Sequence, residues 1–214
     1  MILSRGRRYL FIHAPKTGGT SMALALEARA MKDDIMLGDT PKAKQRRKRV
    51  SNVQAAGRLW KHSTLADLDG LVRHDELADL FVFTLVRNPW DRMVSYYHWL
   101  RGQSFAHPVV GLARDLEFGE FVQHALVAQS FSRASAVSYV TDTQGDMRAD
   151  LFIRLEHLAD DIAPLQAYLG FELDIPHVNR SDRHEGYRSL YNDSSRAAVA
   201  EICAADISRF SYRF

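Results

Sequence analysis

The sequence of 214 residues predicts an α/β fold with a central, mostly parallel sheet flanked by helices. Two apolar runs, residues 9–12 and 80–86, have the character of strands, and each ends in a polar turn that opens into a helix-forming segment. The second run is almost wholly apolar, as expected of a central parallel strand that is buried on both faces. Alternation of strands and helices is typical of this class, and the length fits one domain over residues 1–214.

The composition is that of an ordinary soluble globular protein. Hydrophobic residues make up 46% and charged residues 25%, and the formal net charge is +2, which does not favour nucleic acid or a membrane surface as partner. No apolar run approaches a membrane span, and the first one is too short for a signal peptide, so the sequence predicts a cytoplasmic protein. The lone cysteine, Cys203, excludes an internal disulfide and is expected to be a small core residue.

The first strand–turn–helix unit has the features of an anion-binding loop. Strand Tyr9–Ile12 is followed by a turn with two glycines, and the helix-forming run Met22–Ala28 comes next. Backbone N–H groups at such a turn, together with the helix dipole, favour negative charge. Gly18 and Gly19 let the backbone approach an anion closely. The candidate ligand-binding residues of this loop are Lys16, Thr17, Gly18, Gly19, Thr20 and Ser21.

The position of the lysine decides which kind of anion loop this is. In the nucleoside triphosphate loop the lysine follows the glycines, whereas Lys16 precedes them and directly follows Pro15. The stretch Pro-Lys-Thr-Gly-Gly-Thr-Ser resembles the 5′-phosphosulfate loop of sulfotransferases, which use 3′-phosphoadenosine 5′-phosphosulfate (PAPS) as donor. The alternative is an ordinary connection between a strand and a helix.

A second polar turn follows the strand at residues 80–86. Arg87 comes directly after that strand, Asn88 and Pro89 are good residues for a helix start, and the helix is expected to run to about Arg101. Ligands bind at the carboxyl ends of strands in open α/β sheets. Arg87 and Ser95, eight residues later, resemble the 3′-phosphate-binding motif of sulfotransferases, and a guanidinium with a hydroxyl suits a phosphate.

Together, these motifs resemble the glycan type of sulfotransferase, which includes the heparan sulfate 2-O- and 6-O-sulfotransferases and many small bacterial members. Residues 152–158 and 176–181 are similar to later segments of that group. The resemblance implies a three-layer sandwich like that of P-loop NTPases, PAPS as donor, no metal, and a small-molecule or glycan acceptor. Leu155 departs from the group, in which many members carry an aromatic residue beside the glutamate.

Sulfuryl transfer needs a group that stabilises the leaving phosphate and a base for the acceptor. Lys16 is the candidate for the first role because it is a cation within the loop. His62 is the first candidate for the base, since imidazole suits that task and the related 2-O- and 6-O-transferases place a histidine at the end of their second strand. His13 is the second candidate, whereas His98 is expected to have a packing role.

Two other functions remain open from the sequence. One is a P-loop-like nucleotide kinase, which would have a lysine after the glycines and an acidic strand end that holds a metal ion. The other is a non-catalytic module that binds a nucleotide or a glycan on the same fold.

Two further features bear on the acceptor. Six cations lie between Lys42 and Arg49, which predicts either a solvated face or a docking patch for an anionic acceptor. Trp60, Trp90 and Trp99 are candidates for stacking on sugar rings, although tryptophans beside apolar neighbours are more often core residues.

The remaining segments are assigned from their periodicity and turn residues. Leu59–His62 is expected to be a short strand, with Ser63 or Thr64 capping a helix that runs through Leu71. The other expected elements are helices in residues 109–138, a hairpin-like stretch at 137–141 that turns at 142–145, a strand at 150–155, a helix at 158–169 ended by Gly170, a polar loop at 176–193 and a last helix at 194–207.

Overall fold

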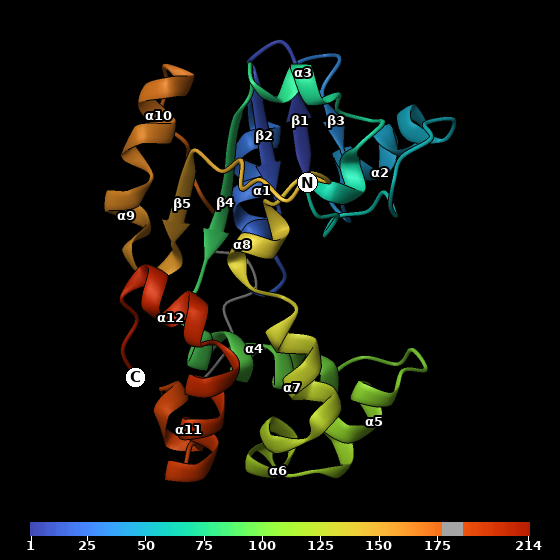
Figure 1. Cartoon of the computed structure of the whole chain (residues 1–214). Helices are drawn as coiled ribbons and strands as arrows, with labels where there is room; N and C mark the ends of the chain where they lie inside the picture. Colours follow the sequence, from blue (N-terminus) through green and yellow to red (C-terminus); the bar gives the residue numbers. More distant parts are fainter. Residues whose placement is uncertain (177–185) are drawn as a thin grey trace. The chain divides into compact units, whose positions relative to one another are not determined.

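The computed structural model describes residues 1–176 and 186–214, and it divides into two compact units. Unit 1 comprises the described residues of Met1–Val86 and Ala136–Asn179, and unit 2 comprises those of Arg87–Ser135 and Arg180–Phe214 (Figure 1). Each unit is described by itself below. Residues 177–181, within the last segment of the family resemblance, lie outside the described residues.

Unit 1 is built on a five-stranded sheet with the order β3-β1-β2-β4-β5 (Figure 1). The strands are β1 (Ile2–Ser4), β2 (Tyr9–Ile12), β3 (Ile35–Met36), β4 (Phe81–Val86) and β5 (Leu151–Arg154). Strands β2, β4 and β5 run parallel, whereas β1 is antiparallel to both of its neighbours. The predicted α/β fold with a mostly parallel sheet is therefore confirmed. The sequence analysis missed β1 and β3, which have only three and two residues.

Strands β2 and β4 are buried on both faces, as the apolar runs predict. Phe11 and Phe83 are paired in register and lie in one core cluster, together with side chains of α1 (Gly19–Ala28) and α10 (Ala163–Leu169). Leu10 and Val82 are also paired and lie in a second cluster on the opposite face. This alternation of side chains follows from the pleat of a strand. It places α1, and therefore the start of that helix, against the central strands.

The segment at residues 59–71 differs from the prediction. Leu59–His62 is not a strand, and the only helical turn that follows within this segment is η2 (Ala66–Leu68). The reason is local side-chain bonding: the hydroxyl of Ser63 donates to the carbonyl oxygen of Arg58, at 2.8 Å. Side-chain bonds of this kind compete with strand pairing and favour turns.

Thr64, one of the two predicted caps, forms hydrogen bonds just before η2, whose N-cap residue is Leu65 and has no side-chain cap bond. Thr64 and Asp67 exchange side-chain to backbone hydrogen bonds, at 2.8 and 3.2 Å. This is the reciprocal pattern of a helix start. The predicted helix start thus lies close to the observed one, but the helix ends at Leu68 and not at Leu71.

The stretch at residues 137–147 is mostly not a hairpin. Residues 137–139 belong to α8 (Ala136–Tyr139), and pairing is limited to one bridge between Thr141 and Met147. The predicted turn is present, because Asp142 accepts hydrogen bonds from the backbone N–H groups of Gln144 and Asp146.

The helical region after β5 agrees with the prediction, with one interruption. It consists of η3 (Leu155–His157), α9 (Leu158–Asp161) and α10, with a break at Ile162. Pro164 explains the break, since a proline lacks the N–H that a continuous helix would need there. Gly170 ends α10 in the left-handed region, with φ of 75°.

Unit 2 is helical over its described residues. Its elements are α4 (Pro89–Arg101), α5 (Pro108–Asp115), α6 (Phe118–Gln123), α7 (Ala125–Ser132), η4 (Tyr187–Leu190), α11 (Asp193–Ile202) and α12 (Ala204–Phe210). The predicted start of α4 is confirmed: the Asn88 side chain accepts a hydrogen bond from the N–H of Trp90, and Pro89 is the first helical residue.

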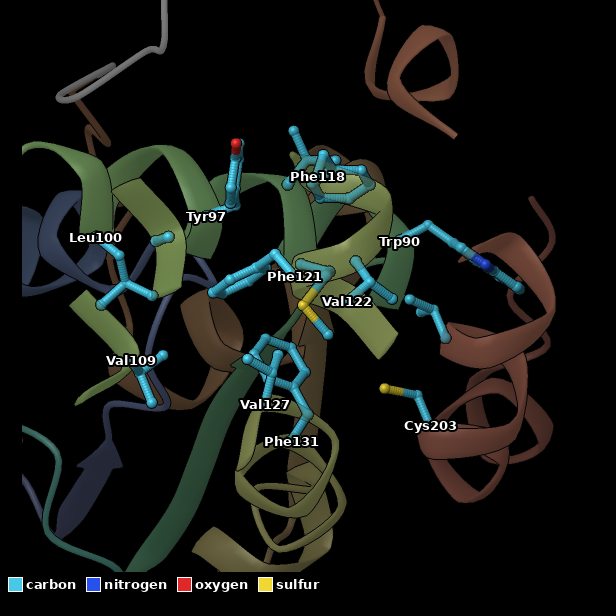
Figure 2. Close-up of a cluster of buried hydrophobic side chains, with 14 of the residues drawn as sticks. Trp90, Tyr97, Leu100, Val109, Phe118, Phe121, Val122, Val127, Phe131 and Cys203 are labelled. Carbon is cyan, nitrogen blue, oxygen red and sulfur yellow. The ribbon is translucent and has the colours of Figure 1, made fainter. Parts of the chain in front are cut away.

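A buried cluster joins α4 to the neighbouring helices of unit 2. Figure 2 shows Trp90, Tyr97 and Phe121 in it, and Phe121 is fully buried. Cys203 lies in the same cluster, at the point where the predicted last helix is divided into α11 and α12. Burial raises the pKa of its thiol to about 12, so it acts as a core residue, as predicted.

The remaining short elements belong to unit 1. They are α2 (Pro41–Arg46), η1 (Arg47–Val50) and α3 (His74–Leu77). None of the helices in the part of the chain that the structure describes is both long and apolar enough to cross a membrane.

Candidate functional site

The turn between β2 and α1 has the backbone of an anion-binding loop. Lys16 and Gly18 adopt positive φ angles of 65° and 87°, and Thr17 between them does not. An alternation of this kind turns successive N–H groups toward one side, which makes a concave site for an anion. Glycine adopts such angles without cost, whereas Lys16 holds a conformation that side chains disfavour. The predicted loop is therefore tightly turned at the expected residues.

Helix α1 begins at Gly19 without a side-chain cap. Gly18 is its N-cap residue, and among the described residues no side chain accepts a hydrogen bond as the cap of this helix start. The first N–H groups of a helix have no partner within the helix, and the dipole adds partial positive charge there. The Oγ1 of Thr17 donates to the carbonyl oxygen of Ala14, at 2.8 Å. The Thr17 hydroxyl therefore stabilises the turn itself.

The ring of His13 is packed against the start of α1. A Cβ atom at Gly19 would overlap the Cδ2 and Nε2 atoms of this ring. One face of the ring stacks on Phe11, with centroids 5.8 Å apart. His13 is 7% exposed, and burial lowers the pKa of its imidazole well below the ordinary value. Gly19 is therefore needed because a neutral, buried histidine occupies the space of a side chain.

Leu155 packs against Gly18 of the loop. A Cβ atom at Gly18 would lie 2.7 Å from the Cδ1 atom of Leu155. The residue that departs from the family pattern thus contacts the loop directly. An aromatic ring at this position would meet the same glycine, so the smaller leucine changes the wall of the loop.

His62 lies beside the same strand end. Its Nδ1 is 2.8 Å from the carbonyl oxygen of His13, and its ring meets the His13 ring edge-on, with centroids 4.7 Å apart. A carbonyl oxygen can only accept, so Nδ1 carries the hydrogen and Nε2 is left as the proton acceptor. Burial lowers the pKa of His62 to about 4, so its ring is neutral at pH 7. The ring is thus held in the tautomer that a general base requires.

The two histidines differ in burial and in which ring nitrogen can accept a proton. The Nε2 edge of His13 is packed on Gly19, whereas His62 is less buried and its Nδ1 is the bonded nitrogen. This favours His62 over His13 as the base. Trp60 also contacts His62 edge-on, at 5.0 Å between centroids, and 39% of it is exposed.

Arg87 and Ser95 belong to unit 2, whereas Lys16 and His62 belong to unit 1. Within unit 2, Arg87 contacts Asp91 through Nε at 2.8 Å and Nη2 at 2.6 Å. Asp91 lies midway between Arg87 and Ser95, and a spacing of four residues places neighbours on one helix face. Asp91 therefore orients the guanidinium from the same face that carries Ser95.

Half of the basic run has contacts within unit 1. Lys42 donates to the carbonyl oxygen of Glu27, at 2.5 Å. Arg46 donates to the carbonyl oxygen of Met31 and Arg49 to that of Asp34, both at 2.8 Å. The members of the run for which no such bond is found here are Lys44, Arg47 and Lys48, and all three are exposed. Part of the run thus stabilises the segment after α1, and the docking interpretation concerns the other part.

Several residues near the loop had no signal in the sequence. Lys61 forms an ion pair with Asp39, and Glu27 accepts a hydrogen bond from Thr40 at 2.5 Å. These pairs join segments that are far apart in the chain, so neither spacing nor periodicity could reveal them. A cluster of three His, Cys, Asp or Glu side chains suited to a metal ion is not found within the described residues.

Comparison with known proteins identifies the family. The model of the sulfotransferase family matches residues 1–213. The chain belongs to the sulfotransferase family. Mouse sulfotransferase SULT7A1, whose crystal structure is a complex with PAP, has a similar fold. The TM-score is 0.53 at 14% sequence identity, and the match covers 92% of this chain and 83% of the mouse chain. No curated protein sequence matches the chain.

We expect Gly19→Ala to disrupt the loop of this sulfotransferase. The added methyl group overlaps the edge of the His13 ring, which is buried and stacked on Phe11. Overpacking of this kind costs about 1–3 kcal/mol. Thermal unfolding should show a lower Tm. Gly111→Ala is the control, since nothing lies within 4 Å of its Cβ position and alanine favours a helix. Equal Tm values for Gly19→Ala and the wild type would contradict the described packing.

We expect the free energy of unfolding to fall as the pH is lowered from about 6.5 toward 4.5. His13 and His62 have pKa values below the ordinary value of 6.5 when folded, so the unfolded chain binds more protons in this range. The stability they contribute is complete above pH 6.5 and is lost at up to about 1.4 kcal/mol per pH unit for each histidine. Urea unfolding at several pH values measures this slope. His62→Asn should make it shallower, and a slope identical to that of the wild type would refute the assignment.

Proposed function

We propose that this sulfotransferase moves a sulfuryl group from PAPS to a hydroxyl of an acceptor, with a carbohydrate as the acceptor class. Lys16 and the backbone from Thr17 to Ser21 would hold the 5′-phosphosulfate. Arg87 and Ser95 would hold the 3′-phosphate. The support is the family, the uncapped start of α1 and the match of both motifs to the donor-binding motifs of sulfotransferases.

The observation that carries this proposal is the hydrogen bond between His62 Nδ1 and the backbone of His13. It leaves Nε2 of His62 with a lone pair next to the strand end that leads into the loop. In the proposed step, the acceptor oxygen forms a bond to sulfur while its proton passes to His62 Nε2. The bond between sulfur and the bridging oxygen breaks, and Lys16 stabilises the electron pair that this oxygen takes. In this proposal His62 is the base that a positioned acceptor hydroxyl requires.

The finer parts of the proposal rest on the motifs alone. These are the likeness to the glycan type and its small bacterial members and the absence of a metal requirement. The proposed cytoplasmic location rests on the hydropathy of the sequence instead. Exposed Trp60 beside His62 supports a sugar acceptor, because an aromatic face suits the apolar face of a sugar ring.

We expect His62→Ala to abolish sulfuryl transfer and to leave binding of the product 3′-phosphoadenosine 5′-phosphate (PAP) nearly unchanged. The variant removes the base but no group assigned to the donor. Transfer of labelled sulfate from PAPS and calorimetry with PAP measure the two effects. General base catalysis is worth about 10²–10⁴-fold, so the loss of rate should fall in that range.

His98→Ala is the matched control, since this histidine lies on α4 and is exposed. Normal turnover by His62→Ala would remove His62 from the mechanism. Binding of PAP by the wild type without transfer to any acceptor would favour a non-catalytic module instead.

A further inference from the structure

The tail, residues 211–214, follows α12 and packs on the start of α4 within unit 2. The half-buried ring of Phe214 lies edge-on to the ring of Trp90, with centroids 5.6 Å apart. The carbonyl oxygen of Arg213 accepts a hydrogen bond from Nδ2 of Asn88, at 2.8 Å. These two bonded residues are 125 positions apart in the sequence, so the start of α4 has a partner that its own segment does not supply.

The side chain of Asn88 uses both of its polar groups at this point. Its Oδ1 accepts from the N–H of Trp90, at 3.1 Å, which caps α4, and its Nδ2 is the donor to the tail. One amide can do both because it has an acceptor oxygen and a donor nitrogen. The side-chain conformation that caps the helix is therefore the one that binds the tail.

Trp90 is also held by two groups from the segment before the tail. The hydroxyl of Tyr191 donates to its carbonyl oxygen, at 2.9 Å, and its indole Nε1 donates to the carbonyl oxygen of Arg196, at 3.0 Å. The ring of Tyr191 meets that of Phe214 edge-on, with centroids 5.4 Å apart. Edge-to-face pairs favour one arrangement of the rings. The first turn of α4 is therefore fixed through its backbone, its cap and its tryptophan.

This turn adjoins the residues assigned to the 3′-phosphate of the donor. Arg87 directly precedes the cap residue Asn88, and its guanidinium contacts Asp91 in the first turn, at 2.6 Å. Ser95 lies further along the same helix. Bonds from a guanidinium and a hydroxyl to one phosphate depend on the geometry between the two groups. The position of the first turn therefore bears directly on this site.

The tail cannot act on a phosphate by direct contact of these groups. The carbonyl oxygen of Arg213 is an acceptor, as phosphate oxygens are, and the ring of Phe214 is apolar. Its effect on the donor must therefore pass through the residues of α4 that it holds.

We propose that the tail is a positioning element for the 3′-phosphate site. Through Asn88 and Trp90 it fixes the first turn of α4, and this turn sets the geometry between the groups that bind the phosphate. The inference rests on the proposed function for the role of Arg87 and Ser95, whereas the contacts of the tail do not depend on it. The effect concerns one end of the donor, because the loop assigned to the 5′-phosphosulfate belongs to unit 1.

PAP and adenosine 5′-phosphate (AMP) are the probes, because they differ only in the 3′-phosphate. Calorimetry with the full chain gives the Kd of each, and the ratio of the two values reports the contribution of the 3′-phosphate. We expect Phe214→Ala to weaken PAP binding by roughly tenfold, as the loss of about one hydrogen bond to a charged group would. AMP binding should stay nearly unchanged. A general loss of folded protein would weaken both ligands alike and leave the ratio as it is.

Three further variants keep the test decisive. Phe214→Tyr keeps the ring and should keep the ratio of the wild type. Phe214→Leu keeps most of the apolar volume but loses the ring contacts, so it should lower the ratio and answers the same question if Phe214→Ala does not fold. Phe171→Ala is the matched control, because it removes a half-buried phenylalanine of unit 1 that packs against Arg7 and Arg29. It should leave the ratio as in the wild type.

The proposal is overturned if the folded Phe214→Ala or Phe214→Leu protein has the ratio of the wild type, or if Phe171→Ala lowers the ratio equally. The wild type separates this failure from that of the proposed function. If it prefers PAP to AMP and the Phe214 variants do so by the same factor, the role of the tail is wrong and the donor assignment stands. If it binds both nucleotides equally, the assignment of the 3′-phosphate site is wrong, and the role of the tail is wrong as well.

Discussion

The close packing of His13 on Gly19 is the constraint on which the loop and its surroundings depend. The buried ring fills the space beside the first residue of α1, so that position must be glycine. The backbone of the same histidine accepts the hydrogen bond that holds His62. One residue at the end of β2 thus shapes the anion loop with its side chain and fixes the tautomer of the candidate base with its carbonyl group. The neutral state of both rings follows from their burial.

The parts of the fold that the sequence predicted well are those set by local patterns. The strand β4, the cap and proline at the start of α4 and the glycine at the end of α10 each follow from residues within one short segment. The short strands β1 and β3 escaped prediction because three and two residues carry too little periodicity. Leu59–His62 has the composition of a strand, but the Ser63 hydroxyl holds the backbone in a turn.

In the candidate site, too, local motifs were predictable and contacts between distant segments were not. The loop from Lys16 to Ser21 and the motif at Arg87 could be named from order and spacing, because each is contiguous. Contacts between segments that are apart in the chain could not be predicted in this way. Examples are Leu155 against Gly18 and Glu27 beside Thr40. The basic run is a mixed case. Its composition suggested a docking surface, whereas Lys42, Arg46 and Arg49 have backbone partners that only the fold supplies.

The central claim is that the loop holds the phosphosulfate end of a 3′-phosphorylated donor and not a nucleoside triphosphate. Thermal unfolding of the wild type with PAP, with ATP and without ligand tests it most directly. At saturating and equal concentrations, the account predicts a clear rise in Tm with PAP and little or none with ATP, because a ligand stabilises only the state that binds it. A rise with ATP that equals or exceeds the rise with PAP would contradict it.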